Sequence, residues 1–303
     1  MKLRETELIA ARTNLRGEVT QMRTQQLASR DPDAVVSVIA EMIGCFADES
    51  AIDAVGIGLG GLVLSTGTVR RAPFLNWTDV DLAGMVTARS GIPTLVDNDV
   101  AAFTEYEHWF GLGNDARRFA VLTLGAGLGF GLVSNDEFVR NEDYGAGAIE
   151  HWPLRSDGPV CPVGHRGCSS AMISSDAIAA QATMAVGRPV SFGEALDLAS
   201  AHDEHVEPIV QAAGEALGML LAAVCNLTLP ERIILGGEGV QLATIAYESI
   251  VRTLANYRDP LTHTPPVLIA SGGNAEWCRG AAVLAIREFV LGRLLTRNVS
   301  RTD

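Results

Sequence analysis

Hydrophobic and polar positions alternate at the start of the chain and then change to a helical period. The alternation predicts two short strands within Glu7–Met22, joined by a turn at Arg16-Gly17. From Asp31 to Phe46, apolar residues recur three and four places apart, which predicts a helix with Asp31 as its N-cap. Strand patterns then alternate with helix patterns to the end of the chain, which is typical of an α/β fold with buried sheets.

The remaining elements follow this alternation twice over. Buried strands are expected at 54–63, 93–97, 119–124, 130–133, 232–237 and 267–270. Further helices are expected at 82–90, 100–110, 176–185, 192–201 and 206–226, then one ending near Tyr257 and one at 277–295. The stretch 141–175 is rich in loop residues. We therefore predict a duplicated α/β fold with an N-terminal lobe at 1–110, joined by the last helix, and a larger lobe at 111–276.

The composition of the chain excludes several classes of protein. With 303 residues, 48% of them hydrophobic and 19% charged, the chain can bury the cores of two domains. A net charge of -13 argues against a basic surface for nucleic acid. The five cysteines are few and odd in number, the start is polar, and no stretch approaches a membrane span. These features predict a cytoplasmic protein with mostly free thiols and no membrane partner.

Polar residues end the predicted strand at 93–97. Asp97, Asn98 and Asp99 stand where the ligands of α/β proteins bind, at the carboxyl end of a buried strand. One carboxylate could serve as a general base for a hydroxyl group, and the amide could hold a second hydroxyl. Alternatively, Asp97 or Asp99 only caps the helix that follows. The pattern by itself favours neither interpretation.

A glycine motif, Gly125-Ala-Gly-Leu-Gly129, follows the strand at 119–124. Its bare backbone would let N–H groups approach phosphate oxygens, and Thr123 would add a hydroxyl. Because the motif opens no helix, it does not predict a dinucleotide site. A tight hairpin would explain the same glycines.

Soft metal ligands gather in the loop-rich stretch. His151, Cys161 and Cys168 are the residue types of a structural zinc site, and His165 could complete a set of four. A loop with two ordinary thiols and a surface histidine is the alternative.

In this order, the motifs resemble those of the ROK family of repressors, open reading frames and kinases, over about Glu7 to Phe289. The resemblance implies a duplicated actin-like, hexokinase-like ATPase fold with a cleft between two lobes. It implies a sugar site at Gly61, Asn98, Asp99, Glu150 and His151, with Asp99 as the base of the kinases. It implies contacts to nucleotide phosphates at Thr6, Thr123, Gly125, Gly127, Gly236 and Gly237. It also implies zinc at His151, Cys161 and Cys168.

The chain departs from the family's kinases at its start. Lys2 stands at the aspartate of their Asp-x-Gly-x-Thr phosphate loop, and Arg4 stands at its glycine. A lysine cannot bind magnesium, and a side chain at Arg4 would block the approach of a phosphate. The strand that precedes this loop is expected to be missing or to lie upstream of Met1.

Other departures fall in the sugar and zinc signatures. Where the family usually has proline, aspartate, glutamate, glycine, the middle cysteine and glutamate, this chain has, in the same order, Gly60, Leu64, Ala148, Glu150, Val163 and Ser170. A hydroxylated ligand would thus meet fewer carboxylates than in a hexose kinase. The segment from Glu276 resembles the corresponding helix in the repressor branch of the family.

These observations predict a sugar-responsive transcriptional regulator, here its effector-binding and dimerising body. It would act as a homodimer and meet DNA only through a domain absent from this chain, such as a helix-turn-helix encoded upstream of Met1. A structural zinc ion is the expected cofactor. The alternative is an ATP- and magnesium-dependent sugar kinase with Asp99 as base, and a third possibility is a non-catalytic partner that binds no sugar.

Overall fold

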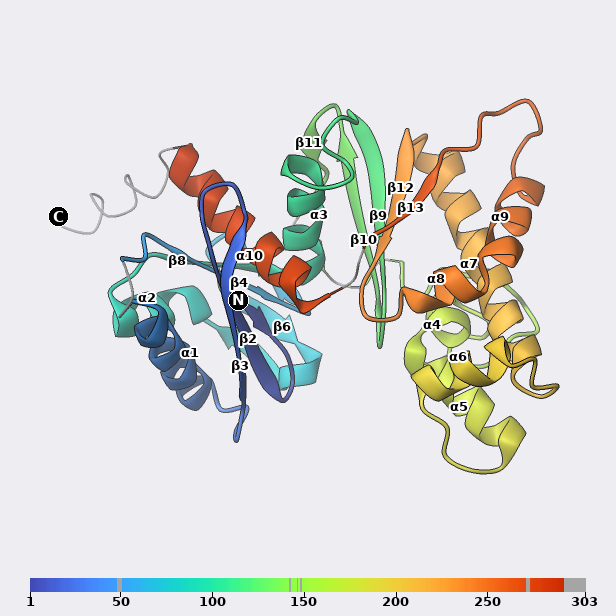
Figure 1. Cartoon of the computed structure of the whole chain (residues 1–303), viewed down its shortest axis with the longest axis horizontal. Helices are drawn as coiled ribbons and strands as arrows, with labels where there is room; N and C mark the ends of the chain where they lie inside the picture. Colours follow the sequence, from blue (N-terminus) through green and yellow to red (C-terminus); the bar gives the residue numbers. More distant parts are fainter. Residues whose placement is uncertain (48–50, 142, 146, 148, 271–272, 292–303) are drawn as a thin grey trace. The chain divides into compact units, whose positions relative to one another are not determined.

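Two five-stranded sheets, one in each unit of the chain, have the same order of strands. The computed structural model describes residues 1–47, 51–141, 143–145, 147, 149–270 and 273–291. Unit 1 comprises residues 1–114, 140–146 and 273–303, and unit 2 comprises 115–139 and 147–272 (Figure 1).

The sheet of unit 1 is mixed. Its strands are β1 (Lys2–Leu3), β2 (Glu7–Thr13), β3 (Val19–Gln26), β4 (Val55–Leu59) and β8 (Thr94–Asn98). They lie in the order β3-β2-β1-β4-β8. The pairs β3–β2 and β2–β1 are antiparallel, whereas β1–β4 and β4–β8 are parallel.

The sheet of unit 2 repeats this pattern. Its strands are β9 (Arg118–Leu124), β10 (Leu128–Ser134), β11 (Glu137–Phe138), β12 (Arg232–Gly236) and β13 (Val267–Ile269). They lie in the order β11-β10-β9-β12-β13, again with two antiparallel and then two parallel pairings. The predicted duplication is therefore present in the topology. The turn between β1 and β2 corresponds to the turn between β9 and β10.

Helices cover the unit 1 sheet. They are α1 (Pro32–Ala47), α2 (Leu82–Ser90), α3 (Asp99–Trp109) and α10 (Asn274–Val290). α1 packs against α2, and α10 packs against α3 and β4. Residues Val55, Ile57 and Leu59 of β4 belong to the buried core. Gly56 between them allows α10 to approach closely, because a Cβ there would lie 1.7 Å from the Ala281 carbonyl oxygen.

In unit 2, α7 (Glu207–Thr228) lies in the core. Around it are α4 (Ser169–Ile173), α5 (Ser175–Val186), α6 (Phe192–Ser200), α8 (Gln241–Ile245) and α9 (Tyr247–Asn256). Against our prediction, α7 is long and apolar enough to span a membrane, with a mean hydropathy of 1.6 over an 18-residue window. Because 61% of that window is buried inside the protein, α7 is better explained as a core helix.

Several local predictions were wrong. The segment 54–63, expected to be one strand that runs into a glycine turn, contains a second strand after the glycines, β5 (Leu62–Val63), which forms a small sheet with β6 (Val69–Ala72) and β7 (Trp77–Val80). Alternation alone did not reveal these short strands. The helix expected to end near Tyr257 is divided into α8 and α9, and α4 lies in the stretch assigned to loops. Residues 292–295 of the last predicted helix lie outside the described residues.

The first strand is also present, contrary to expectation. Lys2 and Leu3, assigned to a phosphate loop from the sequence, form the short central strand β1. They pair with β2 on one side and with Gly58 and Leu59 of β4 on the other. The amino group of Met1 donates a hydrogen bond to the Gly56 carbonyl oxygen at 2.7 Å. Parallel pairing with β4 thus places Lys2 beside the carboxyl ends of β4 and β8.

Candidate functional site

Asp99, the predicted base, forms an ion pair with Lys2. The Lys2 ammonium group donates to Oδ2 of Asp99, and the side chains are only 9% and 13% exposed. The same ammonium group lies 4.4 Å from the ring centroid of Trp277, at a distance typical of a cation–π contact. Lys2, which the resemblance compares with the aspartate of a phosphate loop, therefore pairs with the carboxylate that was expected to act as base.

Asn98, rather than either aspartate, caps α3. Its Oδ1 accepts hydrogen bonds from the N–H groups of Val100 and Ala101, so the alternative in which Asp97 or Asp99 caps this helix is excluded. Its Nδ2 donates to the Gly61 carbonyl oxygen at 2.8 Å. Gly61 has a φ of 145°, which favours glycine. The cap therefore joins two of the predicted sugar-binding residues in unit 1.

Asp97 has a different partner. Two nitrogens of the Arg140 guanidinium group donate to its two carboxylate oxygens at 2.7 and 3.1 Å. This bidentate geometry is the stronger form of an arginine–carboxylate pair. Nearby, burial raises the pKa of Tyr144, and the negative charges of Asp97 and Asp99 raise it further. Asp97 therefore anchors the segment that carries Arg140 and Tyr144 beside the end of β8.

Two buried carboxylates lie further along α3. Glu105 is paired with Arg287 of α10, while burial raises its pKa above the ordinary value. Burial raises the pKa of Glu107 to about 7, although this carboxylate accepts a hydrogen bond from the Leu112 N–H at 2.7 Å. Neither was singled out from the sequence, because their burial follows from the packing of α10 on α3.

In unit 2, the glycine motif forms a tight hairpin. Leu124 at the end of β9 pairs directly with Leu128 at the start of β10, so the turn contains only Gly125-Ala-Gly127. Gly129 lies within β10, which makes the predicted loop too long. Thr123 is paired in register with Gly236 of β12, and a Cβ on Gly237 would lie 2.4 Å from the Leu124 carbonyl oxygen. The predicted phosphate residues of unit 2 are therefore gathered at one end of its sheet.

Two carboxylates lie beside these glycines. Oε1 of Glu238 is 2.7 Å from the position that a Cβ on Gly125 would take, and Oε1 of Glu150 is 2.5 Å from that position at Gly127. Glu150 also accepts a hydrogen bond from the Leu128 N–H at 3.2 Å. Negative charge at a phosphate-binding turn opposes the approach of a phosphate. Glu150, predicted to bind sugar, supports the hairpin here.

Thr6, the remaining predicted phosphate residue, lies in the turn between β1 and β2 in unit 1. It is exposed, and its carbonyl oxygen accepts a hydrogen bond from the Leu27 N–H at 2.8 Å. In the same turn, the Arg4 guanidinium group donates to Glu7 at 2.9 Å and to Asn274 at 3.1 Å. The Arg4 side chain therefore links this turn to β2 and to the start of α10. Ala148, at the family's glutamate position, lies outside the described residues.

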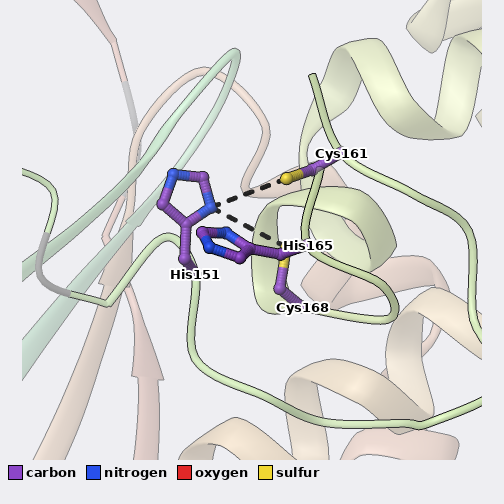
Figure 2. A group of neighbouring side chains, drawn as sticks. All are labelled: His151, Cys161, His165 and Cys168. Carbon is purple, nitrogen blue, oxygen red and sulfur yellow. Dashed lines mark hydrogen bonds between the residues drawn. The ribbon is translucent and has the colours of Figure 1, made fainter. Parts of the chain in front are cut away.

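His151, Cys161, His165 and Cys168 converge in unit 2. One ligand atom from each lies within 4.8 Å of the others, and Nδ1 of His151 is 3.8 Å from both sulfur atoms (Figure 2). A tetrahedral zinc site with bonds of roughly 2.0–2.3 Å has ligand atoms separated by roughly 3.3–3.8 Å. The four side chains can therefore hold a metal ion, with His165 as the fourth ligand.

The loop around Cys161 favours this arrangement. Burial opposes ionisation of Cys161, but backbone N–H groups of its loop and a hydrogen bond with Cys168 together lower the pKa of its thiol, whereas burial raises the pKa of the Cys168 thiol. The turn closes with a hydrogen bond from the Cys161 N–H to the His165 carbonyl oxygen at 2.8 Å. A thiolate is the form of cysteine that binds metal.

Comparisons with known proteins agree with the fold. The model of the ROK family matches residues 5–288. A xylose repressor from Bacillus spizizenii is 24% identical over 284 residues, covering 92% of this chain and 74% of the repressor. An N-acetylmannosamine kinase from Vibrio vulnificus is 33% identical over 244 residues, covering 78% of this chain and 81% of the kinase. For three further curated relatives, the match spans only 55–63% of their length.

Solved structures show the same likeness to both branches. A ROK family transcriptional regulator, described as a homolog of the E. coli MLC protein, has a TM-score of 0.87 and 26% identity. That match covers 99% of this chain and 80% of the regulator. A ROK family glucokinase from Streptomyces griseus, in complex with glucose and AMPPNP, has a TM-score of 0.78 and 23% identity. It covers 93% of this chain and 97% of the glucokinase. The hexokinase-like, actin-like α/β fold is therefore shown, and both repressors and sugar kinases are relatives.

Proposed function

Since the chain belongs to the ROK family, we propose that it is the sugar-binding body of a transcriptional regulator and transfers no phosphate. The observation that carries this proposal is the largely buried ion pair between Lys2 and Asp99. A general base must reach the hydroxyl proton that it removes. Here Oδ2 of Asp99 is held by an ammonium group, and its other oxygen accepts a hydrogen bond from the Val100 N–H.

The phosphate side supports the same conclusion. Transfer of a phosphoryl group depends on positioning and on positive charge around the phosphates. The glycine hairpin of unit 2 instead has Glu150 and Glu238 beside it. In unit 1, Lys2 replaces the aspartate that would hold magnesium, and Arg4 replaces a glycine. The first replacement would remove a ligand of the magnesium ion, and the second would keep the backbone from coming close to a phosphate.

The residues proposed to bind sugar are still present. Gly61, Asn98 and Asp99 are grouped in unit 1, and a ligand hydroxyl could take the place of the hydrogen bond from Asn98 to Gly61 while Lys2 stays paired with Asp99. His151 belongs to the metal cluster of unit 2, where we propose a structural zinc ion. The ion would hold four side chains of one loop together. In a regulator, ligand binding would shift a homodimer between two arrangements, only one of which suits DNA.

Two assays test this proposal. The first measures ADP formed from ATP and magnesium with a panel of hexoses, and we expect no turnover above the rate without sugar. The second follows the melting temperature with the same sugars, and we expect a ligand of the folded state to raise it. Turnover of roughly 1 per second or more, within the usual range of enzymes, would overturn the regulator proposal.

A sugar kinase is the second candidate, because Asp99 is present and N-acetylmannosamine kinase is among the relatives. It makes a separate prediction. Asp99→Asn should then abolish ATP-dependent phosphorylation, while Asp79→Asn, at an exposed aspartate paired with Arg70, should leave it unchanged.

A further inference from the structure

An aromatic ring is exposed beside the candidate sugar residues of unit 1. Phe74 lies in the short 3-10 helix Pro73–Leu75 and is 52% exposed. Its chain neighbours Ala72, Leu75 and Trp77 are all buried. The indole N–H of Trp77 also donates to the Arg30 carbonyl oxygen at 2.6 Å. The segment is therefore fixed on both sides of an aromatic side chain that remains accessible.

The ring of Phe74 and the carboxylate of Asp99 both approach Gly60. Cδ2 of Phe74 and Oδ2 of Asp99 are each 3.7 Å from the position that a Cβ on Gly60 would take. The next residue, Gly61, accepts the hydrogen bond from the Asn98 amide. One aromatic ring, one carboxylate and one amide are thus gathered around two consecutive glycines.

We propose that Phe74 forms the apolar wall of the sugar site and determines its specificity for pyranose rings. This inference rests on the proposed function, because it assumes that Asn98 and Asp99 bind a sugar. A pyranose with equatorial hydroxyls presents C–H groups on its faces and hydroxyls at its rim. The faces suit contact with an aromatic ring, and the rim suits a carboxylate and an amide. An open-chain polyol lacks such a face.

Gly60 provides an independent way to test the same site. Its φ is not in the left-handed region, so alanine is compatible with its backbone. The added methyl group would be in ordinary van der Waals contact with Phe74 and Asp99. Gly60→Ala should therefore fold normally and yet weaken sugar binding, because the methyl group occupies the space beside the ring.

The experiment is isothermal titration calorimetry of the full chain with D-glucose and D-xylose as pyranoses and D-mannitol as an open-chain polyol. We expect at least one pyranose, and not mannitol, to bind the wild type. Phe74→Ala should weaken that binding about tenfold, whereas Phe74→Tyr, which keeps the ring, should stay within about twofold. Phe289→Ala removes another exposed ring of unit 1 and should leave binding unchanged.

The possible results separate the two proposals. If neither pyranose binds the wild type, sugar sensing by this site and the role of Phe74 both fail. If a pyranose binds the wild type, and Phe74→Ala with an unchanged melting temperature binds it equally well, only the role of Phe74 is overturned. Binding of mannitol as tight as that of the pyranoses would also overturn it.

Discussion

The turn between β1 and β2 in unit 1 and the turn between β9 and β10 in unit 2 occupy the same place in duplicated sheets. The unit 2 turn keeps Gly125 and Gly127, whereas the unit 1 turn contains Arg4. Arg4 donates to Glu7 and Asn274, and its neighbour Lys2 pairs with Asp99. Since both turns join antiparallel strands, the fold does not require glycine there. In unit 2 a Cβ on either glycine would lie within 2.7 Å of a glutamate oxygen, whereas in unit 1 the Arg4 side chain lies outside the turn and pairs with Glu7 and Asn274.

In the cluster of His151, Cys161, His165 and Cys168 in unit 2, by contrast, a nearby residue makes up for a missing ligand. Val163, which the resemblance compares with the middle cysteine of the family's zinc signature, has no group that can bind a metal. His165, two residues further along, brings a ring nitrogen to the same group of ligands. His165 thus provides a ligand atom in the same loop as Val163, whereas Lys2 neutralises the charge of the Asp99 carboxylate. In unit 1 the carboxylate of Asp99 is paired with Lys2, whereas in unit 2 four side chains that can bind a metal still lie close together.

Removing a ligand from unit 2 should have the largest effect. We expect Cys168→Ala to lose zinc and to lower the melting temperature by about 10 °C, because the ion links distant parts of a loop and its binding contributes to folding. Metal analysis and thermal unfolding measure both effects. Cys45→Ser, at an exposed cysteine of unit 1, should keep one zinc ion per chain. Wild-type protein without zinc after growth and purification in zinc would contradict the prediction.

Breaking the ion pair of unit 1 should come next. Lys2→Ala leaves the mostly buried carboxylate of Asp99 without its cation, which should cost about 3 kcal/mol in the free energy of unfolding. Lys2→Met combined with Asp99→Asn removes both charges and should recover most of this loss. Urea unfolding measures both variants.

The control for this pair lies in the same unit. Arg70→Ala breaks an exposed pair with Asp79 and should cost less than about 1 kcal/mol. Equal losses for Lys2→Ala and Arg70→Ala would mean that the Lys2 pair is as weak as one at the surface. The contrast between the two units would then lose its energetic basis.

Changing the fourth ligand of unit 2 should have a smaller effect than removing a cysteine. We expect His165→Ala to weaken zinc binding at least about tenfold, and His165→Cys to preserve it, because a thiolate can replace the imidazole. Competition with a chromogenic chelator measures this affinity. His202→Ala changes an exposed histidine outside the cluster and should have no effect. If His165→Ala binds zinc like the wild type, the ion has three protein ligands.

The sequence predicted the family, the repeated strand–helix order and three of the four side chains that converge in the His/Cys cluster, because these depend on local patterns and spacing. It did not predict that Lys2 meets Asp99, since that contact follows from the parallel pairing of β1 with β4. It also did not separate Asn98 from its neighbours as the helix cap, because all three residues suit that position. The exposure of Phe74 depends on three short strands that alternation did not reveal.

The smallest effect concerns Glu107, a buried carboxylate of unit 1 that accepts a hydrogen bond from the Leu112 N–H. Burial raises its pKa to about 7 in the folded protein, above the ordinary value of 4.5, and the nearby charge of Glu276 also raises it. Between these values the unfolded chain binds fewer protons than the folded one, so this group's contribution to stability is lost as the pH rises. The free energy of unfolding of Glu107→Gln should therefore match that of the wild type at pH 5 and exceed it by about 1–2 kcal/mol at pH 8.

Urea unfolding at both pH values tests this prediction, with the exposed Glu41→Gln as a control that is expected to show no such difference. No gain at pH 8 would mean that the hydrogen bond from the Leu112 N–H offsets the cost of burying the Glu107 carboxylate.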